Sequence, residues 1–271
     1  MFAVKCYKRD CVLLQGRFLG KNKRTHAKKG GGKPVFTIDA HVHTAASGHH
    51  TTDRVIDVAK KAFERGLTAV GICEHASGML NGCTESGFRS LLLSPRTRAG
   101  VKILIGAEAN VFKNGETDIS PELYKKLDYV VASLHKECYK NAGITENTKT
   151  LIHLMERGGC DILGHPADIA YPLDLRAVVK SAKETGVLIE INEASIREGG
   201  YRGDNRALTA ELLLWCKRYN APVSVGSDSH GREFVGVTPT AEAFFSVMNF
   251  PKRLIANRSV DEFLASLRRN R

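Results

Sequence analysis

The sequence of 271 residues has no apolar run that approaches the ~18 residues a helix needs to cross a bilayer. Residues 11–20 make a poor export signal, because Gln15 and Arg17 interrupt their apolar stretch and no small-residue cleavage site follows. The seven cysteines are scattered and none forms a CxxC pair, which argues against a disulfide framework and a thiolate zinc site. These absences predict a cytoplasmic protein with no membrane partner.

Positive charge is concentrated at the amino terminus. The formal net charge is +11, and residues 1–37 hold ten of the 40 Lys and Arg but only one acid, Asp10. The stretch KKGGGKP at 28–34 is typical of a flexible hinge. We therefore expect a basic, flexible extension over residues 1–34 and a folded domain over residues 35–271. Such an arm either binds nucleic acid or is a solvated tail, and the sequence leaves both open.

Short apolar runs alternate with helical patterns along the rest of the chain. This alternation is typical of parallel strands joined by crossover helices, and seven or eight such units predict an α/β protein with a closed or nearly closed barrel. The expected strands cover residues 35–40, 69–73, 101–107, 128–133, 161–164, 187–192 and 222–226. The clearest helix covers residues 53–65, with Thr51 or Thr52 capping its start and Gly66 its end. Other helices are expected near residues 120–127, 146–157, 174–185, 205–219 and after Ser259.

Seven of the ten histidines stand at or just after the ends of these expected strands. In a parallel barrel all such ends share one rim, and imidazole and carboxylate are the ligands of zinc, manganese and iron. Each short motif alone has a structural explanation, and their conjunction is what predicts a metal centre. Nine candidate ligands, enough for two or three divalent ions, are His41, His43, His49, His75, Glu108, His135, His165, Asp228 and His230. His26, His50 and His153 are expected to be structural or solvated, with His50 a substitute ligand.

The motifs HVHT-x5-H, EH, GAEAN, SLH, GHPAD and GSDSH resemble, in this order, those of the PHP (polymerase and histidinol phosphatase) superfamily. The resemblance covers residues 36–271, is strongest to the small stand-alone phosphatases with three metal ions, and implies a distorted (β/α)7 barrel. It also implies ligand sets: a first ion on His41, His43, Glu108 and Asp228, a second on Glu108, His135 and His165, and a third on His49, His75 and His230. The family usually has Asp where this chain has Glu74, a longer acid that could still orient His75.

A cluster of divalent ions suits the hydrolysis of phosphate esters, because it lowers the pKa of bound water and neutralises phosphoryl oxygens. We therefore expect a metal-dependent phosphatase in which a metal-bridging hydroxide attacks small phosphate monoesters, with Asp228, Glu108 and His230 as catalytic residues. Arginine binds oxyanions through its planar fork. The candidates for the substrate phosphate, in the segment after the sixth strand, are Arg197, Arg202 and Arg206, with Lys136 a weaker one.

Two other enzyme classes stay open. A PHP exonuclease or phosphodiesterase acting on nucleic acid is favoured by the basic arm. An amidohydrolase-type metal hydrolase is less well supported, although its barrels also open with an HxH motif. That class usually has a metal-bridging lysine on a middle strand, where this chain has Glu108, and a lone Asp on the last strand, where this chain has Asp228 followed by His230.

Overall fold

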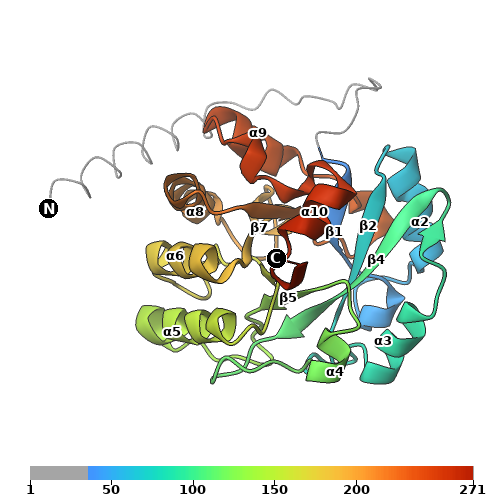
Figure 1. The fold of residues 1–271 in the computed structure, drawn as a ribbon, viewed down its shortest axis with the longest axis horizontal. Helices are drawn as coiled ribbons and strands as arrows, with labels where there is room; N and C mark the ends of the chain where they lie inside the picture. Colours follow the sequence, from blue (N-terminus) through green and yellow to red (C-terminus); the bar gives the residue numbers. More distant parts are fainter. Residues whose placement is uncertain (1–35, 271) are drawn as a thin grey trace, which may run out of the picture.

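Residues 36–270, which the computed structural model describes, form a nearly closed barrel of parallel strands (Figure 1). The strands follow one another around the barrel in the order of the sequence, each parallel to its neighbours. They are β1 (Ile38–Val42), β2 (Ala69–His75), β4 (Val101–Asn110), β5 (Tyr129–Ser133), β6 (Ile162–Leu163), β7 (Leu188–Asn192) and β8 (Val223–Gly226). The short β3 (Thr97–Arg98) pairs antiparallel with β4. The expected basic extension, residues 1–34, lies outside the described residues.

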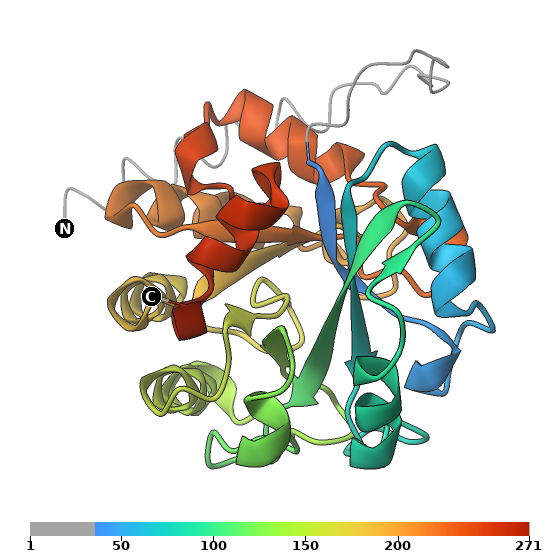
Figure 2. The ribbon, with the colours of Figure 1, turned by 45° about the vertical axis from the view of Figure 1, so that its right-hand side comes forward.

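Helices cover the outside of the barrel on two sides (Figures 1 and 2). On one side lie α2 (Val55–Glu64) and α3 (Glu85–Leu92), and on the other a row of α5 (Gly143–Glu156), α6 (Leu175–Thr185) and α8 (Arg206–Tyr219). The connections contain α4 (Pro121–Tyr124) and α7 (Glu193–Ile196), and α9 (Pro239–Val247) and α10 (Val260–Ser266) follow the last strand. Among residues 36–270, no helix has the length and hydropathy to cross a membrane.

The predicted (β/α)7 barrel is confirmed, and all seven expected strands are present. The sequence patterns did not indicate α3, α7, α9 or β3. The expected cap of α2 at Thr51 or Thr52 is wrong, because Arg54 occupies the N-cap and its backbone N–H is bound by Asp57. The Thr51 hydroxyl instead accepts a hydrogen bond from the Asp53 N–H in the preceding turn. Gly66, with φ of 75°, follows the helix as expected.

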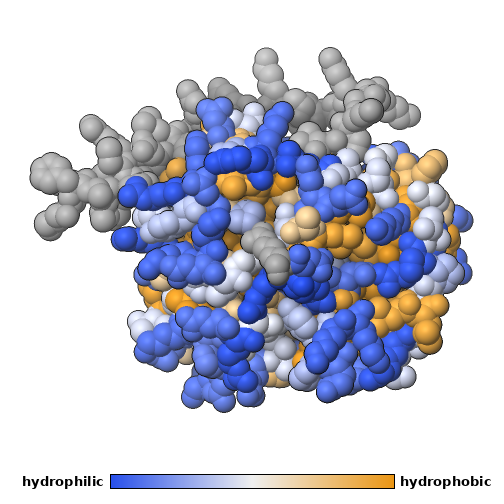
Figure 3. Space-filling view, in the orientation of Figure 1, coloured by the Kyte–Doolittle hydropathy of each residue, from blue (hydrophilic) through white to orange (hydrophobic). Residues whose placement is uncertain are grey.

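The interior of the barrel is filled by side chains from the first halves of the strands. Tyr129 lies at its centre, fully buried, and its hydroxyl donates to the Ala40 carbonyl over 2.7 Å. Gly71 and Gly106 leave the space for this ring, since a Cβ at either position would collide with it. Phe263 of α10 packs edge-on against Tyr129 and closes the barrel at the amino-terminal end of its strands. The face that carries α10 is largely hydrophilic, with hydrophobic patches between the polar side chains (Figure 3).

Asn257 joins the two edge strands where the sheet would otherwise be open. Its Nδ2 donates to the carbonyls of Ile38 in β1 (3.1 Å) and Val225 in β8 (2.9 Å), and its Oδ1 accepts from the Val225 N–H (2.7 Å). Beyond it, the Asp228 N–H donates directly to the His41 carbonyl over 2.9 Å. The seam therefore brings the first and last strands together at their carboxyl ends.

Candidate metal centre

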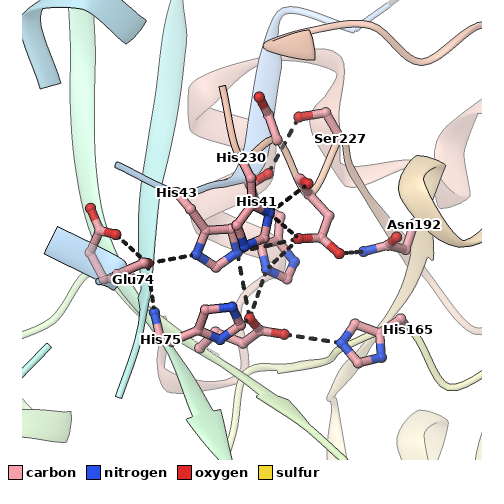
Figure 4. A network of polar contacts seen from close by, with 12 residues as sticks. His41, His43, Glu74, His75, His165, Asn192, Ser227 and His230 are labelled. Carbon is pink, nitrogen blue, oxygen red and sulfur yellow. Dashed lines mark hydrogen bonds and ion pairs between the residues drawn. The ribbon is translucent and has the colours of Figure 1, made fainter. Parts of the chain in front are cut away.

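The nine predicted ligands lie at the carboxyl-terminal rim of the barrel, and Figure 4 shows five of them there, His41, His43, His75, His165 and His230. Seven of them are buried, while His230 is partly exposed and His49 lies further out, in the loop after β1. Three groups of residues place their ligand atoms within 4.8 Å of one another: His41, His43 and Asp228; His75, Glu108 and His135; and His43, His75 and His230. The strand ends thus bring together side chains that lie far apart in the sequence.

Glu108, at the carboxyl end of β4, is central to this cluster. Its Oε2 lies 3.3 Å from His41 Nε2 and 2.8 Å from His75 Nδ1. Its Oε1 lies 3.2 Å from His135 Nε2 and 3.1 Å from His165 Nε2. One carboxylate therefore faces imidazoles with each of its two oxygens.

Asp228 faces the cluster from the loop after β8. Its Oδ1 lies 3.3 Å from His43 Nε2, and its Oδ2 accepts a hydrogen bond from Asn192 Nδ2 over 3.3 Å. The backbone of Asp228 has φ of 52°, and that of His165 has φ of 27°. Side chains other than glycine rarely adopt this left-handed region, and such strain is concentrated at functional sites.

The outermost part of the cluster is a stack of imidazole rings. The His43 ring lies 4.3 Å from that of His75 and 4.2 Å from that of His230, both nearly parallel. The ring of His49 lies 4.8 Å from that of His75 and 5.3 Å from that of His230. The exposed His50 packs edge-on against His49, so it adjoins the cluster without entering it.

The hydrogen bonds of the histidines fit a metal centre. Among the predicted ligands, the buried atoms with no hydrogen-bond partner are His41 Nε2, His43 Nε2, His75 Nδ1, His135 Nε2, Glu108 Oε2 and Asp228 Oδ1. Burial without a partner is costly, so these orphaned atoms call for a ligand. In three histidines the other ring nitrogen is held: His41 Nδ1 by Glu190 (2.7 Å), His43 Nδ1 by Ser47 (2.9 Å) and His135 Nδ1 by Asn110 (2.7 Å). Metal-binding histidines are oriented in this way.

The electrostatics favour cation binding at Glu108, His230 and His43. At His41, by contrast, burial is outweighed by the carboxylates of Glu190, Glu108 and Asp228, which raise the pKa well above its ordinary value, so that a cation must displace a proton there. Burial alone would raise the pKa of Glu108, but the neighbouring histidines outweigh it and hold that pKa well below its usual value. Burial lowers the pKa of His230 to about 4, although Asp228 acts in the opposite direction. Burial, followed by the neighbouring His230 and His75, lowers the pKa of His43 well below its ordinary value. The carboxylate is therefore ionised and these two imidazoles are neutral, the forms that bind metal.

Several side chains that contact and orient the predicted ligands were not predicted from the sequence. Glu190 of β7 contacts His41 Nδ1 and accepts a hydrogen bond from the His165 backbone N–H over 2.8 Å. The feature of the sequence that could have indicated Glu190 is the presence of an acid within the apolar run LIEIN. Glu74 does not bond the ring of His75 as suggested, because its carboxylate accepts hydrogen bonds from Thr44 and from Ser47 Oγ, which holds His43.

The three arginine candidates lie in different environments. Arg202 is nearly buried, with Nη2 3.4 Å from Asp228 Oδ2 and Nη1 3.6 Å from Asp168 Oδ2, and its Nε has no partner. Arg206 pairs with Asp204 at the start of α8, and Arg197 stacks over the ring of Phe234. The side chain of Lys136 is largely exposed. The structure thus brings Arg202 alone among these four to the ligand cluster.

Comparison with known proteins identifies relatives over almost the whole chain. A probable phosphatase from Caldanaerobacter subterraneus subsp. tengcongensis is 36% identical over 245 residues, covering 90% of this chain and 95% of the relative. One from Clostridium acetobutylicum is 37% identical over 226 residues, covering 82% of this chain and 90% of the relative.

Solved structures share the fold at low sequence identity. The histidinol phosphate phosphatase of Lactococcus lactis subsp. lactis, complexed with zinc, L-histidinol and phosphate, has a TM-score of 0.57 at 15% identity and covers 80% of this chain and 95% of its own. A chain of an archaeal ribonuclease P bound to mature tRNA has a TM-score of 0.51 at 13% identity and covers 84% of this chain and 87% of its own. The family model for the PHP domain matches residues 39–196. With the curated relatives, this match shows that the chain belongs to the PHP family.

Proposed function

We propose that this protein is a metal-dependent phosphoesterase that hydrolyses small phosphate monoesters. The observation that carries the proposal is the set of orphaned ligand atoms, which point from buried side chains into one space. We further propose two or three divalent ions per chain, zinc or else manganese or iron. The probable phosphatases among the relatives, and the zinc and phosphate bound in the Lactococcus structure, support the same activity.

The ligand sets that we propose are those that the family resemblance implies, and the groups of neighbouring donor atoms support them in part. His41, His43, Glu108 and Asp228 would hold one ion, and Glu108 with His135 and His165 a second. His49, His75 and His230 would hold a third, which is supported by the distance of 4.8 Å between the ring centroids of His49 and His75. Bound ions of this kind lower the pKa of a coordinated water and neutralise phosphoryl oxygens. Glu108 and Asp228 fix the charge of the site, and His230 completes its outer edge.

Arg202 is the residue that we expect to contact the substrate phosphate. Its guanidinium is held between Asp228 and Asp168, and its unpartnered Nε leaves a hydrogen-bond donor for a phosphoryl oxygen. A planar donor group beside a metal ligand would bind an oxyanion at the mouth of the site. Arg197 and Arg206 lie further from the ligand cluster, and any role for them would be at the rim.

Elemental analysis of protein purified without chelator tests the metal content, and we expect two or three transition ions per chain. Asp228→Asn keeps the shape of the side chain but removes its charge. We expect it to lower turnover of p-nitrophenyl phosphate at least ~100-fold, the scale observed when a principal electrostatic group is lost. Asp204→Asn is the control, since Asp204 is exposed and pairs only with Arg206 among the described contacts.

Three results would count against the proposal. Less than one ion per chain, with no activity recovered on adding manganese or zinc, would refute the metal centre. An Asp228→Asn variant within tenfold of wild type would move Asp228 out of the site. Faster hydrolysis of bis(p-nitrophenyl) phosphate or of oligonucleotides than of monoesters would indicate a phosphodiesterase instead.

A further inference from the structure

A hairpin after β4 carries an acid back to the metal centre. Strand β4 ends at Asn110, and the chain then turns so that Val111 pairs antiparallel with Thr117. The Phe112 N–H donates to the Glu116 carbonyl over 2.9 Å, and Gly115 takes the left-handed conformation, with φ of 70°, that the turn requires. The residue after this hairpin is Asp118, which therefore lies beside the end of the strand it came from.

The Asp118 carboxylate accepts three hydrogen bonds. Its Oδ1 accepts from the backbone N–H of Asn110 over 2.8 Å. Its Oδ2 accepts from Asn110 Nδ2 over 2.6 Å and from the Gly78 N–H over 2.7 Å. A carboxylate offers acceptors only, so it fixes which end of the buried Asn110 amide is the donor. Asn110 Nδ2 faces Asp118 and the Ala76 carbonyl, and Asn110 Oδ1 faces the opposite way.

The amide of Asn110 in turn fixes His135. Asn110 Oδ1 lies 2.7 Å from His135 Nδ1, so this nitrogen carries the proton and donates it. The other nitrogen, His135 Nε2, is then an unprotonated acceptor, and it lies 3.2 Å from Glu108 Oε1 with no hydrogen-bond partner. A metal ligand must present its lone pair in this way.

We infer that Asp118 is a positioning residue of the metal centre, which sets the orientation and tautomer of His135 through Asn110. The inference rests on the proposed function, because the tautomer of His135 matters for ligation only if a metal ion binds there. We call the hydrogen-bonded series Asp118–Asn110–His135 the relay. Asp118 also accepts a hydrogen bond from the Gly78 N–H in the loop after β2. If its role were only structural, its loss would lower the stability of the protein without specifically lowering its affinity for metal.

Asp118→Asn replaces the carboxylate that accepts the hydrogen bonds of Asn110. The new amide has a single acceptor, its oxygen, for the three donors that the Asp118 carboxylate accepted, so Asn110 Nδ2 loses its charged acceptor and the Asn110 amide is no longer held in one orientation. In the turned orientation, Asn110 presents Nδ2 to His135. His135 then protonates Nε2, which blocks the ligand lone pair. We expect the affinity for one Mn²⁺ per chain to fall about 10- to 100-fold, the usual effect of losing the partner that orients a ligand. Equilibrium dialysis against Mn²⁺ measures it, with thermal unfolding of the metal-free protein monitored in parallel.

Asp128→Asn is the matched control. Asp128 also accepts a hydrogen bond from a backbone N–H, that of Ile105 over 2.5 Å, and pairs with Arg96, but it lies immediately before β5, at the end of the strand away from the ligands. We expect this variant to lose stability without losing metal affinity. Asn110→Ala removes the last link but leaves Asp118 bonded to the Gly78 and residue-110 N–H groups, so it tests the relay even if Asp118→Asn does not fold.

The double variant decides whether the two residues act in series. If Asp118 acts through Asn110, the combined loss of affinity equals that of Asn110→Ala alone. Wild-type affinity in Asp118→Asn or in Asn110→Ala, or losses that add in the double variant, would overturn the inference. Wild-type protein that binds no ion would refute the proposed function itself, which separates the two failures.

Discussion

At the scale of single residues, the centre is built from pairs: a ligand and the side chain that holds it. The histidines and acids at the strand ends were predictable from the sequence, because parallel strands must end at one rim. Their partners were not. In the sequence, Glu190 and Asn110 are simply an acid and an amide within apolar runs. Only the folded barrel, in which β7 lies near β1 and β4 lies beside β5, shows that Glu190 contacts His41 and that Asn110 contacts His135.

The phosphate contact of Arg202 can be tested by substitution. Because a hydrogen bond to a charged group contributes about 1.5–3 kcal/mol, we expect Arg202→Ala to reduce kcat/KM for a monoester roughly 10- to 100-fold. Arg206→Ala is the control, since Arg206 pairs with Asp204 outside the ligand cluster. Steady-state kinetics with manganese-loaded protein measures both. Equal kcat/KM for Arg202→Ala and wild type would remove Arg202 from the substrate site.

At the scale of elements, β1 departs from the alternation that a strand pattern assumes. Ala40 packs inside the barrel, and His41, the next residue, also points inward to Glu108 and Glu190. The pairing of β1 with β2 shifts register between Asp39 and Val42, which turns His41 inward. The sequence indicated that His41 and His43 act together, but it contained no signal for this irregularity.

The close packing around Tyr129 gives a prediction for the inner strands. A methyl group at Gly71 would collide with the Tyr129 hydroxyl. We expect Gly71→Ala to destabilise the protein by about 1–3 kcal/mol, the usual cost of overpacking. Since the nearest atom is the hydroxyl, Gly71→Ala should cost less in a Tyr129→Phe background. Urea unfolding of the four proteins of this cycle, followed by circular dichroism, measures the coupling. Strictly additive losses would show that the ring is not what limits the space.

At the scale of the whole molecule, closure of the barrel depends on a residue outside the strands. Without Asn257, the carbonyls of Ile38 and Val225 and the Val225 N–H would lose their side-chain partner in a buried seam. We expect Asn257→Ala to lower the free energy of unfolding by about 2–4 kcal/mol, because unsatisfied buried groups cost about 1–3 kcal/mol each.

Denaturant unfolding in the presence of EDTA isolates this effect from metal binding. Asn270→Ala is the control, because Asn270 is exposed and its side chain donates to the Leu264 carbonyl. We expect it to change stability by less than about 0.5 kcal/mol. A similar loss in both variants would mean that the seam is held by other contacts.

The seam between β1 and β8 has a consequence for how the protein acquires its metal. His41 and His43 leave the ribosome early in synthesis, whereas Asp228 and His230 leave near its end. The contacts between them span most of the chain, so they cannot form before synthesis has passed residue 230. A nascent chain therefore offers an ion only part of the ligand set that we propose. Binding of the first and third ions then requires that the first and last strands have met, whereas the proposed ligands of the second ion, Glu108, His135 and His165, lie between them.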